Sequence, residues 1–408
     1  MKSKKISVIG LGYIGLPTAA LLASNGYEVV GMDISEHAVG TINQGKIHIV
    51  EPDLDAFVRS SVAAGRLSAF TEPQPGDVYM ICVPTPFHEG SGIPQPNIDF
   101  VLAATRNIAP FVKSGDLVIL ESTSPVGTTE QMQAVLREAG VDVDDIHMAY
   151  CPERVLPGKI MTELVENDRI VGGVTETATK AVADFYRTFV RGHVLETDAK
   201  TAEMCKLTEN SFRDVNIAFA NELSIICDKE GINVWNLIKL ANHHPRVNIL
   251  QPGAGVGGHC IAVDPWFIAA RDEENSKLIQ TARGVNNFKT NWVVEKIKAA
   301  ATEYASKSGG QPKIACLGLA FKPDIDDLRE SPALTVARVL MAQGYDVVAV
   351  EPNIDSHSTI TLVDIEQAVH QCDVLAILVK HRDFIGLDVA HNHSNGVILD
   401  FCGALVQS

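Results

Sequence analysis

Paired cysteines are absent from the sequence. Its eight cysteines are scattered, and no two of them form a CxxC pair or stand at the spacing of metal ligands. This pattern argues against a disulfide scaffold and against a zinc or iron–sulfur site, so we expect no bound metal. We expect reduced thiols that mostly pack in the core of a cytoplasmic protein.

Basic stretches and long apolar runs are also lacking. The formal net charge is −16, the isoelectric point is about 5.2, and no basic stripe occurs, which argues against nucleic acid as the main partner. The apolar segment after the basic start MKSKK is interrupted by Gly10, Gly12, Gly15 and Pro17, so we expect neither a signal peptide nor a membrane anchor there. No other uninterrupted apolar run is long enough to span a bilayer.

The N-terminal residues do carry the pattern of a dinucleotide-binding turn. KISVIG (5–10) indicates a buried strand, Gly10-x-Gly12-x-x-Gly15 opens a helix, and Asp33 ends the next strand. Such glycines let a pyrophosphate approach the helix N-terminus, and the Asp33 carboxylate suits a ribose but repels a 2′-phosphate. We therefore expect NAD as the cofactor. We expect another buried strand at 77–86, and a strand, a turn and the start of a helix at 116–129. This alternation of strands and helices is typical of a doubly wound parallel sheet in an α/β fold.

The end of the chain repeats its beginning. KISVIGLG (5–12) matches KIACLGLA (313–320), and GYEVVGMD (26–33) matches GYDVVAVE (344–351). We expect a second Rossmann-like domain, which lacks the third glycine and so holds its nucleotide differently. The stretch 200–242 predicts a long helix that joins the two domains and forms a homodimer, with a purely internal core helix as the alternative. The predicted boundaries are 1–195 for the NAD domain, 196–300 for a central helical domain and 301–408 for the second Rossmann-like domain.

A glycine-rich segment carries the candidate nucleophile. In GVGGHCIAVDP (255–265), Cys260 follows three glycines and precedes Asp264 by four residues. A thiolate is a strong nucleophile, and the amides of Gly257 and Gly258 could lower the pKa of the thiol. Neighbouring side chains usually point apart, so we do not expect His259 to be its base. An NAD site combined with an activated thiol predicts aldehyde oxidation through a thiohemiacetal and a thioester.

Other candidate site segments surround this one in the sequence. Lys206, Asn210 and Arg213 share one face of the predicted long helix. The segments CPERVLPG (151–158) and GLAFKP (318–323) combine glycine or proline with polar residues, as site loops do. A stripe such as that of Lys206 would, taken alone, usually be a solvated helix face.

The motifs together resemble the UDP-glucose/GDP-mannose 6-dehydrogenase family over nearly the whole chain. They are, in order, GLGYIGLP, VPTP, ESTSPVGTT, CPERVLPG, EMCKLTENSFRDVNIAFANE, HPRVN, GVGGHCIAVDP and GLAFKPDIDDLRESP. The family oxidises the C6 alcohol of a nucleotide sugar to a carboxylate with two NAD. The resemblance is greatest to members that act on UDP-N-acetyl-D-mannosamine, and UDP-N-acetylglucosamine is the alternative substrate.

The resemblance implies roles for three sets of residues. The catalytic set would be Cys260 as nucleophile, Lys206 and Asn210 at the oxyanions, Asp264 in hydrolysis, and Glu153 and Thr123 in holding water. The NAD set would be Gly10, Gly12, Tyr13, Ile14, Gly15, Asp33, Thr85, Thr123 and, from the C-terminal domain, Arg329. The substrate set would be Arg154, Val155, Lys206, Asn210, Arg213, His244, Arg246, Gly257, Phe321 and Lys322, with Arg246 coming from the neighbouring subunit of a dimer.

One position departs from the family pattern. UDP-glucose members commonly carry Phe and Leu after the Glu of the PE motif, whereas this chain has Arg154 and Val155. We expect Arg154 to help recognise a 2-acetamido sugar. Two other functions remain open from the sequence: a nucleotide-sugar-binding protein without catalysis, and a two-electron 3-hydroxyacid dehydrogenase, which would not need Cys260.

Overall fold

The computed structural model describes residues 4–88, 90, 92–258, 260–387, 393 and 396–405. The chain divides into two compact units. The first unit comprises residues 1–208 and 266–271, and the second comprises residues 209–265 and 272–408. Within the part of the chain described, no helix has both the length and the apolar character that a membrane span requires.

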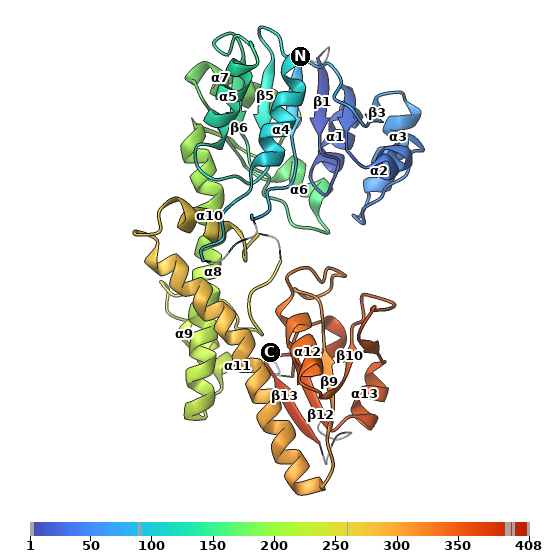
Figure 1. Cartoon of the computed structure of the whole chain (residues 1–408), viewed down its shortest axis with the longest axis vertical. Helices are drawn as coiled ribbons and strands as arrows, with labels where there is room; N and C mark the ends of the chain where they lie inside the picture. The colour runs from blue at the N-terminus through green and yellow to red at the C-terminus, as the bar shows by residue number, and fades with distance from the viewer. Residues whose placement is uncertain are drawn as a thin grey trace. The chain divides into compact units, whose positions relative to one another are not determined.

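The first unit is built on an eight-stranded sheet with the order β3-β2-β1-β4-β5-β6-β7-β8 (Figure 1). All neighbouring strands are parallel except β6 and β7, so the doubly wound parallel sheet predicted from the sequence is confirmed apart from this one pair. Strands such as β4 are apolar and buried throughout because helices cover both faces. The strands are β1 (Lys5–Ile9), β2 (Glu28–Met32), β3 (Leu67–Phe70), β4 (Val78–Ile81), β5 (Leu117–Leu120), β6 (His147–Tyr150), β7 (Arg169–Gly173) and β8 (Val194–Asp198).

Helices pack on both faces of this sheet. One face is covered by α1 (Gly15–Ser24), α3 (Leu54–Ala63), α6 (Ile160–Glu166) and α7 (Glu176–Tyr186). The other is covered by α4 (Asp99–Ile108), the short helix η1 (Ala109–Phe111) and α5 (Thr128–Glu138). The helix α2 (Glu36–Asn43) follows β2.

The second unit repeats this arrangement on a smaller scale. Its sheet has the order β11-β10-β9-β12-β13 and is parallel throughout. The strands are β9 (Lys313–Leu317), β10 (Asp346–Val350), β11 (Thr361–Leu362), β12 (Val374–Ile377) and β13 (Val397–Asp400). The core on one face contains α11 (Lys277–Ser308) and α12 (Pro332–Ala342), and the core on the other contains α13 (Ile365–Gln371) and η2 (Arg382–Phe384). The repeat predicted from the sequence is therefore confirmed as two doubly wound sheets.

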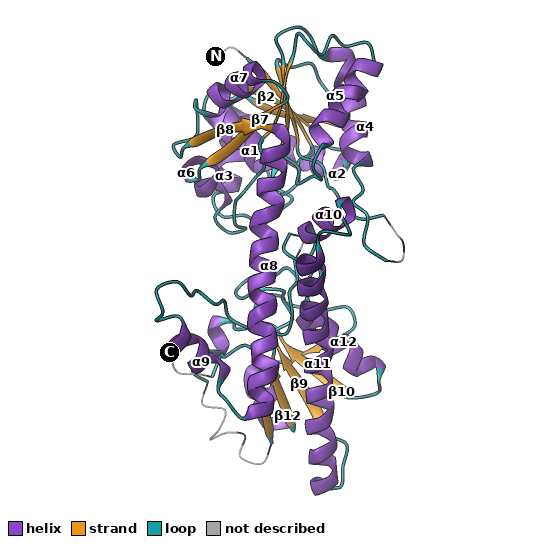
Figure 2. Cartoon of the chain, turned by 90° about the vertical axis from the view of Figure 1, so that its left-hand side faces the viewer, coloured by secondary structure: helices purple, strands orange, loops and turns teal. Residues whose placement is uncertain are grey.

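The predicted helix at 200–242 consists of two helices. They are α8 (Ala199–Glu230) and α9 (Val234–Ala241). Gly231 ends α8 with a positive φ of 68°, and the Asn233 side chain accepts a hydrogen bond from the amide of Asn236 to begin α9. In the second unit, α8 packs beside α11 (Figure 2) through buried hydrogen bonds that join Asp214 to Arg283 and Ser224 to Lys289.

Candidate active site

The glycine turn of the first unit is shaped for a ligand. A side chain at Gly15 would place its Cβ 1.8 Å from the carbonyl oxygen of Gly10, so the turn itself requires that glycine. At Gly12, by contrast, the described structure has no heavy atom within 4 Å of such a Cβ. Gly12 is therefore not required by the packing of the protein. It leaves open space at the N-terminus of α1, which fits the approach of a pyrophosphate.

Asp33 directly follows β2 and is oriented by backbone amides. Its Oδ2 accepts from the amide of Leu11 at 2.9 Å, and its Oδ1 accepts from the amide of Ser35 at 2.9 Å. The residue is half-buried rather than enclosed, which is compatible with a ribose partner. Beside it in the turn, Tyr13 is exposed and Ile14 is half-buried.

Thr85 and Thr123 meet at the ends of two neighbouring strands. The hydroxyl of Thr85 donates to the carbonyl oxygen of Thr123 at 2.6 Å. Thr85 lies after β4 and Thr123 after β5, and parallel strands end at the same edge of the sheet. The structure thus brings together two residues that the sequence assigned to the NAD site.

Glu203, at the beginning of α8, was missed by sequence reasoning. Its carboxylate accepts from the amide of Gly127 at 2.5 Å and from the amide and hydroxyl of Thr129 at 2.9 and 2.7 Å. Glu203 is fully buried. Burial raises the pKa of its carboxyl group, and the hydrogen bonds from Thr129 and Gly127 partly offset this by lowering it. Glu203 thus caps the N-terminus of α5 and fixes α8 to the end of the segment that carries Thr123.

Glu153 is part of a buried charge cluster. Its Oε2 lies 2.6 Å from a guanidinium nitrogen of Arg169, and its Oε1 accepts from the amide of Arg154 at 2.7 Å. Nearby, Glu121 accepts from the hydroxyl of Tyr186 at 2.6 Å. Burial alone would lower the pKa of Arg169, but the carboxylates of Glu153 and Glu121 raise it above its usual range. Arg169 and Glu121 belong to no motif in the sequence. Their only recognisable feature was their position at the ends of buried strands.

Three other predicted residues of this unit occupy separate places. Lys206 is buried on α8. Arg154 is half-buried and donates from its guanidinium to the carbonyl oxygen of Asp168 at 3.2 Å. Val155 packs against the core that contains α1 and α6.

The Cys260 turn belongs to the second unit and brings three predicted residues together. The carbonyl oxygen of Cys260 accepts from the amides of Val263 at 3.0 Å and Asp264 at 2.8 Å, which places Cys260 immediately before α10 (Asp264–Arg271). Asp264 is buried, and its Oδ2 accepts from the side-chain amide of Asn210 at 2.5 Å. Cys260 itself is exposed, as a nucleophile must be. His259 lies outside the described residues.

Packing explains the glycines that precede this turn. A Cβ at Gly258 would lie 2.7 Å from the ring of Phe321, and one at Gly257 would lie 2.3 Å from the carbonyl oxygen of Glu330. The segment before Cys260 therefore lies directly on the segment that begins with Phe321 and contains Lys322. These two glycines therefore allow the close approach of a second protein segment.

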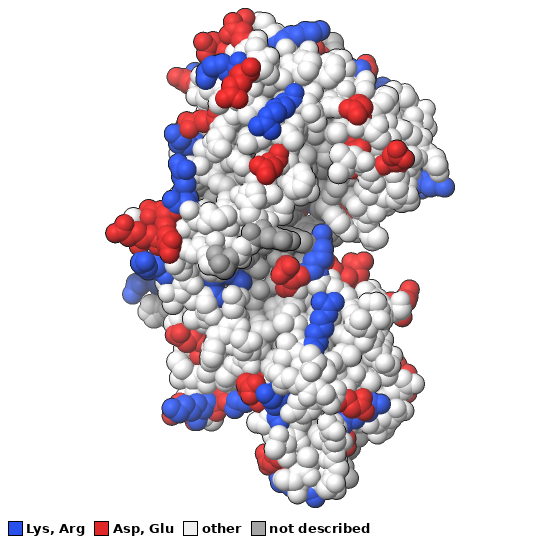
Figure 3. Space-filling model, viewed as in Figure 1, with Lys and Arg blue, Asp and Glu red and all other residues white. Residues whose placement is uncertain are grey.

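The remaining predicted residues lie on the surface of the second unit. Arg213, His244 and Arg246 are exposed, and the Nδ1 of His244 accepts from the amide of Arg246 at 3.3 Å. Arg329 is exposed and forms an ion pair with Asp327 at 2.6 Å. On the face shown in Figure 3, basic and acidic side chains are interspersed and no broad basic surface forms.

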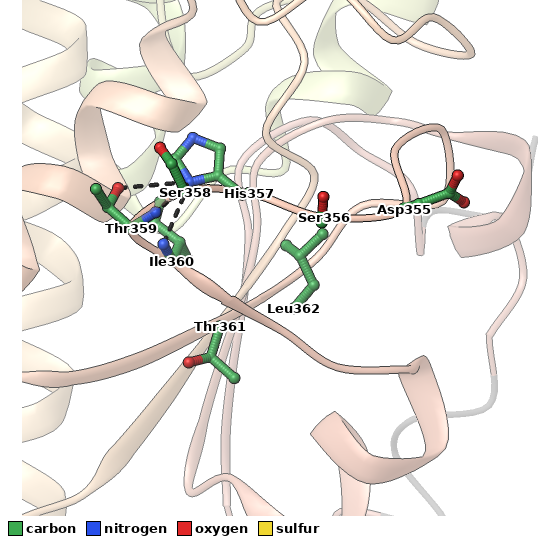
Figure 4. A pocket seen from close by; sticks show the side chains of 8 residues that line it. All are labelled: Asp355, Ser356, His357, Ser358, Thr359, Ile360, Thr361 and Leu362. Carbon is green, nitrogen blue, oxygen red and sulfur yellow. Dashed lines mark hydrogen bonds between the residues drawn. The ribbon is translucent and has the colours of Figure 1, made fainter.

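One surface hollow lies outside these segments. It is lined by the consecutive residues 355–362, before and within β11 (Figure 4). The Nδ1 of His357 accepts from the amides of Thr359 and Ile360, both at 3.2 Å. These hydrogen bonds close the loop on itself, so the hollow is a property of this one turn. Within the described residues, no group of three or more His, Cys, Asp or Glu side chains could hold a metal ion.

The sequence matches the UDP-glucose/GDP-mannose dehydrogenase family in three parts: the NAD binding domain at residues 4–190, the central domain at 200–288 and the UDP binding domain at 315–407. It is 56% identical over 403 residues to the UDP-N-acetyl-D-mannosamine dehydrogenase of Yersinia pestis, covering 94% of this chain and 95% of the relative. It is 54% identical over 409 residues to an NDP-N-acetyl-D-galactosaminuronic acid dehydrogenase of Ralstonia solanacearum, covering 97% and 95%.

The fold agrees with these matches. A solved structure of a UDP-N-acetyl-mannosamine dehydrogenase from Staphylococcus aureus has a TM-score of 0.88 and 42% identity, and the match covers 99% of this chain and 96% of that one. The chain therefore belongs to the UDP-glucose/GDP-mannose dehydrogenase family, and it is an NAD-dependent UDP-sugar dehydrogenase.

Proposed function

We propose that the protein oxidises the C6 alcohol of UDP-N-acetyl-D-mannosamine to the carboxylate, consuming two NAD and one water per sugar. The product, UDP-N-acetyl-D-mannosaminuronate, is a building block of polysaccharides. The observation that carries this proposal is the hydrogen bond between Asn210 and the buried Asp264, immediately after the exposed Cys260 turn. A nucleophile, a carboxylate and an amide donor at one turn are the groups that a thioester route requires.

The proposed chemistry divides among these residues. Bound NAD would supply the hydride acceptor for each of the two oxidations, and in the first the alcohol proton would pass through water to Asp264. The Cys260 thiolate adds to the C6 aldehyde carbon, and the carbonyl electron pair becomes an oxyanion that receives a proton from Lys206. In the second oxidation the neutral Lys206 amine takes that proton back as the hydride leaves, and the sulfur is then held as a thioester. Water then attacks that carbon, gives a proton to Asp264 and displaces the thiolate, which restores Cys260 and releases the carboxylate.

Lys206 and Asn210 support the oxyanion in this scheme. They are four residues apart on α8, so helical geometry places their side chains on one face. Lys206 is buried, and a buried cation directed at developing negative charge contributes roughly 10²–10³ to the rate. Arg329 and the substrate residues Arg213, His244, Arg246, Phe321 and Lys322 keep the roles that the family resemblance gives them.

The acetamido sugar is the substrate class that the relatives favour. The names of both curated relatives above carry an N-acetyl sugar, mannosamine in one and galactosaminuronic acid in the other, at 56% and 54% identity. UDP-N-acetylglucosamine is the alternative substrate and differs from the proposed one only in configuration at C2.

The test is the amount of NADH formed per nucleotide sugar consumed. Absorbance at 340 nm would be followed with UDP-N-acetylmannosamine, UDP-N-acetylglucosamine, UDP-N-acetylgalactosamine and UDP-glucose. Two NADH per sugar, with the highest kcat/KM for UDP-N-acetylmannosamine, is the expected result. One NADH per sugar would remove the thioester from the scheme, and turnover of none of the four would favour a binding protein without catalysis.

A homodimer through α8 forms part of this proposal. Large apolar side chains on α8 and α11 are at least half exposed in the single chain: Phe212 67%, Phe219 51%, Ile226 50% and Phe288 57%. Aromatic side chains exposed together on packed helices are typical of a surface that a partner covers. Light scattering should give the mass of a dimer for the wild type and of a monomer for Phe219→Arg.

The cytoplasm is the proposed location. The cofactor is NAD, and the eight cysteines are scattered without a CxxC pair, which suits a reducing compartment. Fractionation of the native host should recover the dehydrogenase activity with the cytoplasmic enzymes, and recovery with the envelope would contradict this.

A further inference from the structure

Glu351 in the second unit occupies the position that Asp33 has in the first. Each follows the second strand of its sheet, and each accepts from the amide of the residue after the turn glycine: Leu319 to Glu351 at 2.7 Å, Leu11 to Asp33 at 2.9 Å. Their environments differ. The side chain of Glu351 is fully buried, whereas Asp33 is half-buried. A buried carboxylate cannot meet a ribose, so Glu351 has another task.

His381 is the group that covers Glu351. Its ring is completely buried after β12, and its Nε2 lies 3.1 Å from Oε2 of Glu351. Its Nδ1 faces the backbone amide of Asp324 at 3.0 Å and the side-chain amide of Asn353 at 3.1 Å. Phe384 packs edge-on against the ring, with the centroids 5.4 Å apart.

These contacts fix the tautomer of the imidazole. The amide of Asp324 can only donate, so Nδ1 is the acceptor and the ring proton is on Nε2, which donates to Glu351. Burial would raise the pKa of Glu351, but hydrogen bonds from His381 and from the amides of Leu319 and Ala320 lower it to about 2. The pair is therefore an Nε2–H donor of His381 that faces the carboxylate of Glu351.

The pair holds both ends of one short segment. Glu351 Oε2 accepts from the amides of Leu319 and Ala320, and His381 Nδ1 accepts from the amide of Asp324. Asp324 has a left-handed backbone, with φ of 60°, and its carboxylate accepts from the amide of Arg382 at 3.0 Å. The segment between the two anchors contains Phe321 and Lys322.

We propose that Glu351 and His381 are positioning residues for the nucleotide-sugar site: they replace the ribose-binding carboxylate of a dinucleotide fold and hold the segment 319–324 so that Phe321 and Lys322 present one fixed surface to the nucleotide. This inference rests on the proposed function, which assigns Phe321 and Lys322 to the substrate. The ring of Phe321 lies against Gly258, two residues before Cys260. A displaced segment would therefore weaken binding of the nucleotide sugar and would also disturb the Cys260 turn.

Three variants of His381 separate the two hydrogen bonds in the full-length enzyme. In His381→Asn, the side-chain oxygen can still accept near the Nδ1 position, but the contact with Glu351 is lost. In His381→Gln, the longer side chain can reach Glu351, but the acceptor for the Asp324 amide is lost. His381→Phe fills the volume and removes both. His393 supplies the control, because it is a buried histidine at the opposite end of β12, where its ring nitrogens face the carbonyl oxygens of Val369 and Asp373.

The measurements are KM and kcat for the nucleotide sugar, KM for NAD, and the Kd of UDP by calorimetry. A buried amide left without its acceptor is expected to raise the KM for the sugar and the Kd of UDP about ten- to hundredfold in His381→Gln and His381→Phe. His381→Asn is expected to change both less. The KM for NAD should stay within about twofold in all three, and His393→Asn should leave the KM for the sugar and the Kd of UDP at the wild-type values.

Other outcomes overturn the inference. Wild-type KM and UDP affinity in His381→Phe would show that the segment needs no such anchor. A loss of soluble protein or of kcat with no change in UDP affinity, in both His381→Gln and His381→Asn, would assign the pair to general stability only. Measurements on the wild type distinguish failure of this inference from failure of the proposed function. If the wild type binds UDP but oxidises no UDP sugar, the proposed function fails. The Kd of UDP in the His381 variants still tests the anchor in that case.

Discussion

Arg169 and Glu153 form an ion pair of 2.6 Å inside the first unit, with side chains only 1% and 5% exposed. The family resemblance implies that Glu153 helps to hold water, and each of its oxygens also accepts a hydrogen bond from a protein group. These two contacts additionally fix the segment that begins at Arg154. Removing one partner of such a pair leaves an uncompensated buried charge.

Arg169→Met is therefore expected to destabilise the first unit by about 3–5 kcal/mol. Calorimetric unfolding should show a fall of several degrees in the transition of that unit. In the double variant Glu153→Gln/Arg169→Met the loss should be smaller than the sum of the two single losses, because no unpaired charge remains. Strict additivity would show that the two groups do not stabilise each other.

Glu121 predicts how stability depends on pH. Burial raises its pKa from 4.5 to about 6. The folded protein thus holds the proton more tightly than the unfolded chain, so this contribution is fully present below pH 4.5 and is lost as the pH rises through about 6. Relative to wild type, Glu121→Gln should gain about 2 kcal/mol between pH 4.5 and 7.5. Unfolding scans at the two pH values test this, with the exposed Glu138→Gln as the control; an equal pH dependence in all three proteins would contradict it.

The two sheets could be predicted from the sequence because the same order of buried strands and glycine turns occurs in both halves of the chain. Buried strands such as β4 and β12 stand at matching places in the two halves, and the repeat fixes their order. Asn210 and Asp264 are 54 residues apart, so only the family resemblance placed them at one site. Glu351 aligns with Asp33, but its burial depends on His381, which lies 30 residues further along the chain. No local pattern in the sequence reports such a contact.

Asp33 is expected to set the choice of cofactor. Asp33→Ser removes a carboxylate that repels a 2′-phosphate and that can bind a ribose. The KM for NAD should rise about ten- to hundredfold, the usual range for a lost charged hydrogen bond, while the KM for NADP should fall. Initial rates with both cofactors measure this. Since Asp33 also accepts from two backbone amides, the thermal midpoint must be recorded as a control for loss of the turn.

Substitutions of Cys260 and Asp264 are expected to block different steps of the reaction. Cys260→Ala should form no acid, since no thioester can form. Asp264→Asn should give a burst of about two NADH per site and then turn over slowly, because hydrolysis loses its proton acceptor, worth about 10²–10⁴ in rate. Stopped-flow absorbance distinguishes the two variants. Unchanged acid formation in Cys260→Ala would instead fit a two-electron dehydrogenase.

Arg154 is the residue with which the choice of sugar can be tested. Its guanidinium donates to the carbonyl oxygen of Asp168 at 3.2 Å, a contact that holds the side chain beside the backbone of the Glu153 segment. A guanidinium has several donors, so one of them can meet an acetamido oxygen while another keeps the Asp168 contact. Arg154→Phe should lower kcat/KM for UDP-N-acetylmannosamine by about tenfold or more, the cost of one charged hydrogen bond, and should leave the rate with UDP-glucose nearly unchanged. Arg154→Lys keeps the charge but not the planar set of donors. Its kcat/KM for UDP-N-acetylmannosamine should lie between those of the wild type and Arg154→Phe. If the ratio of the two kcat/KM values were the same in wild type and Arg154→Phe, recognition of the acetamido group would have to come from another residue.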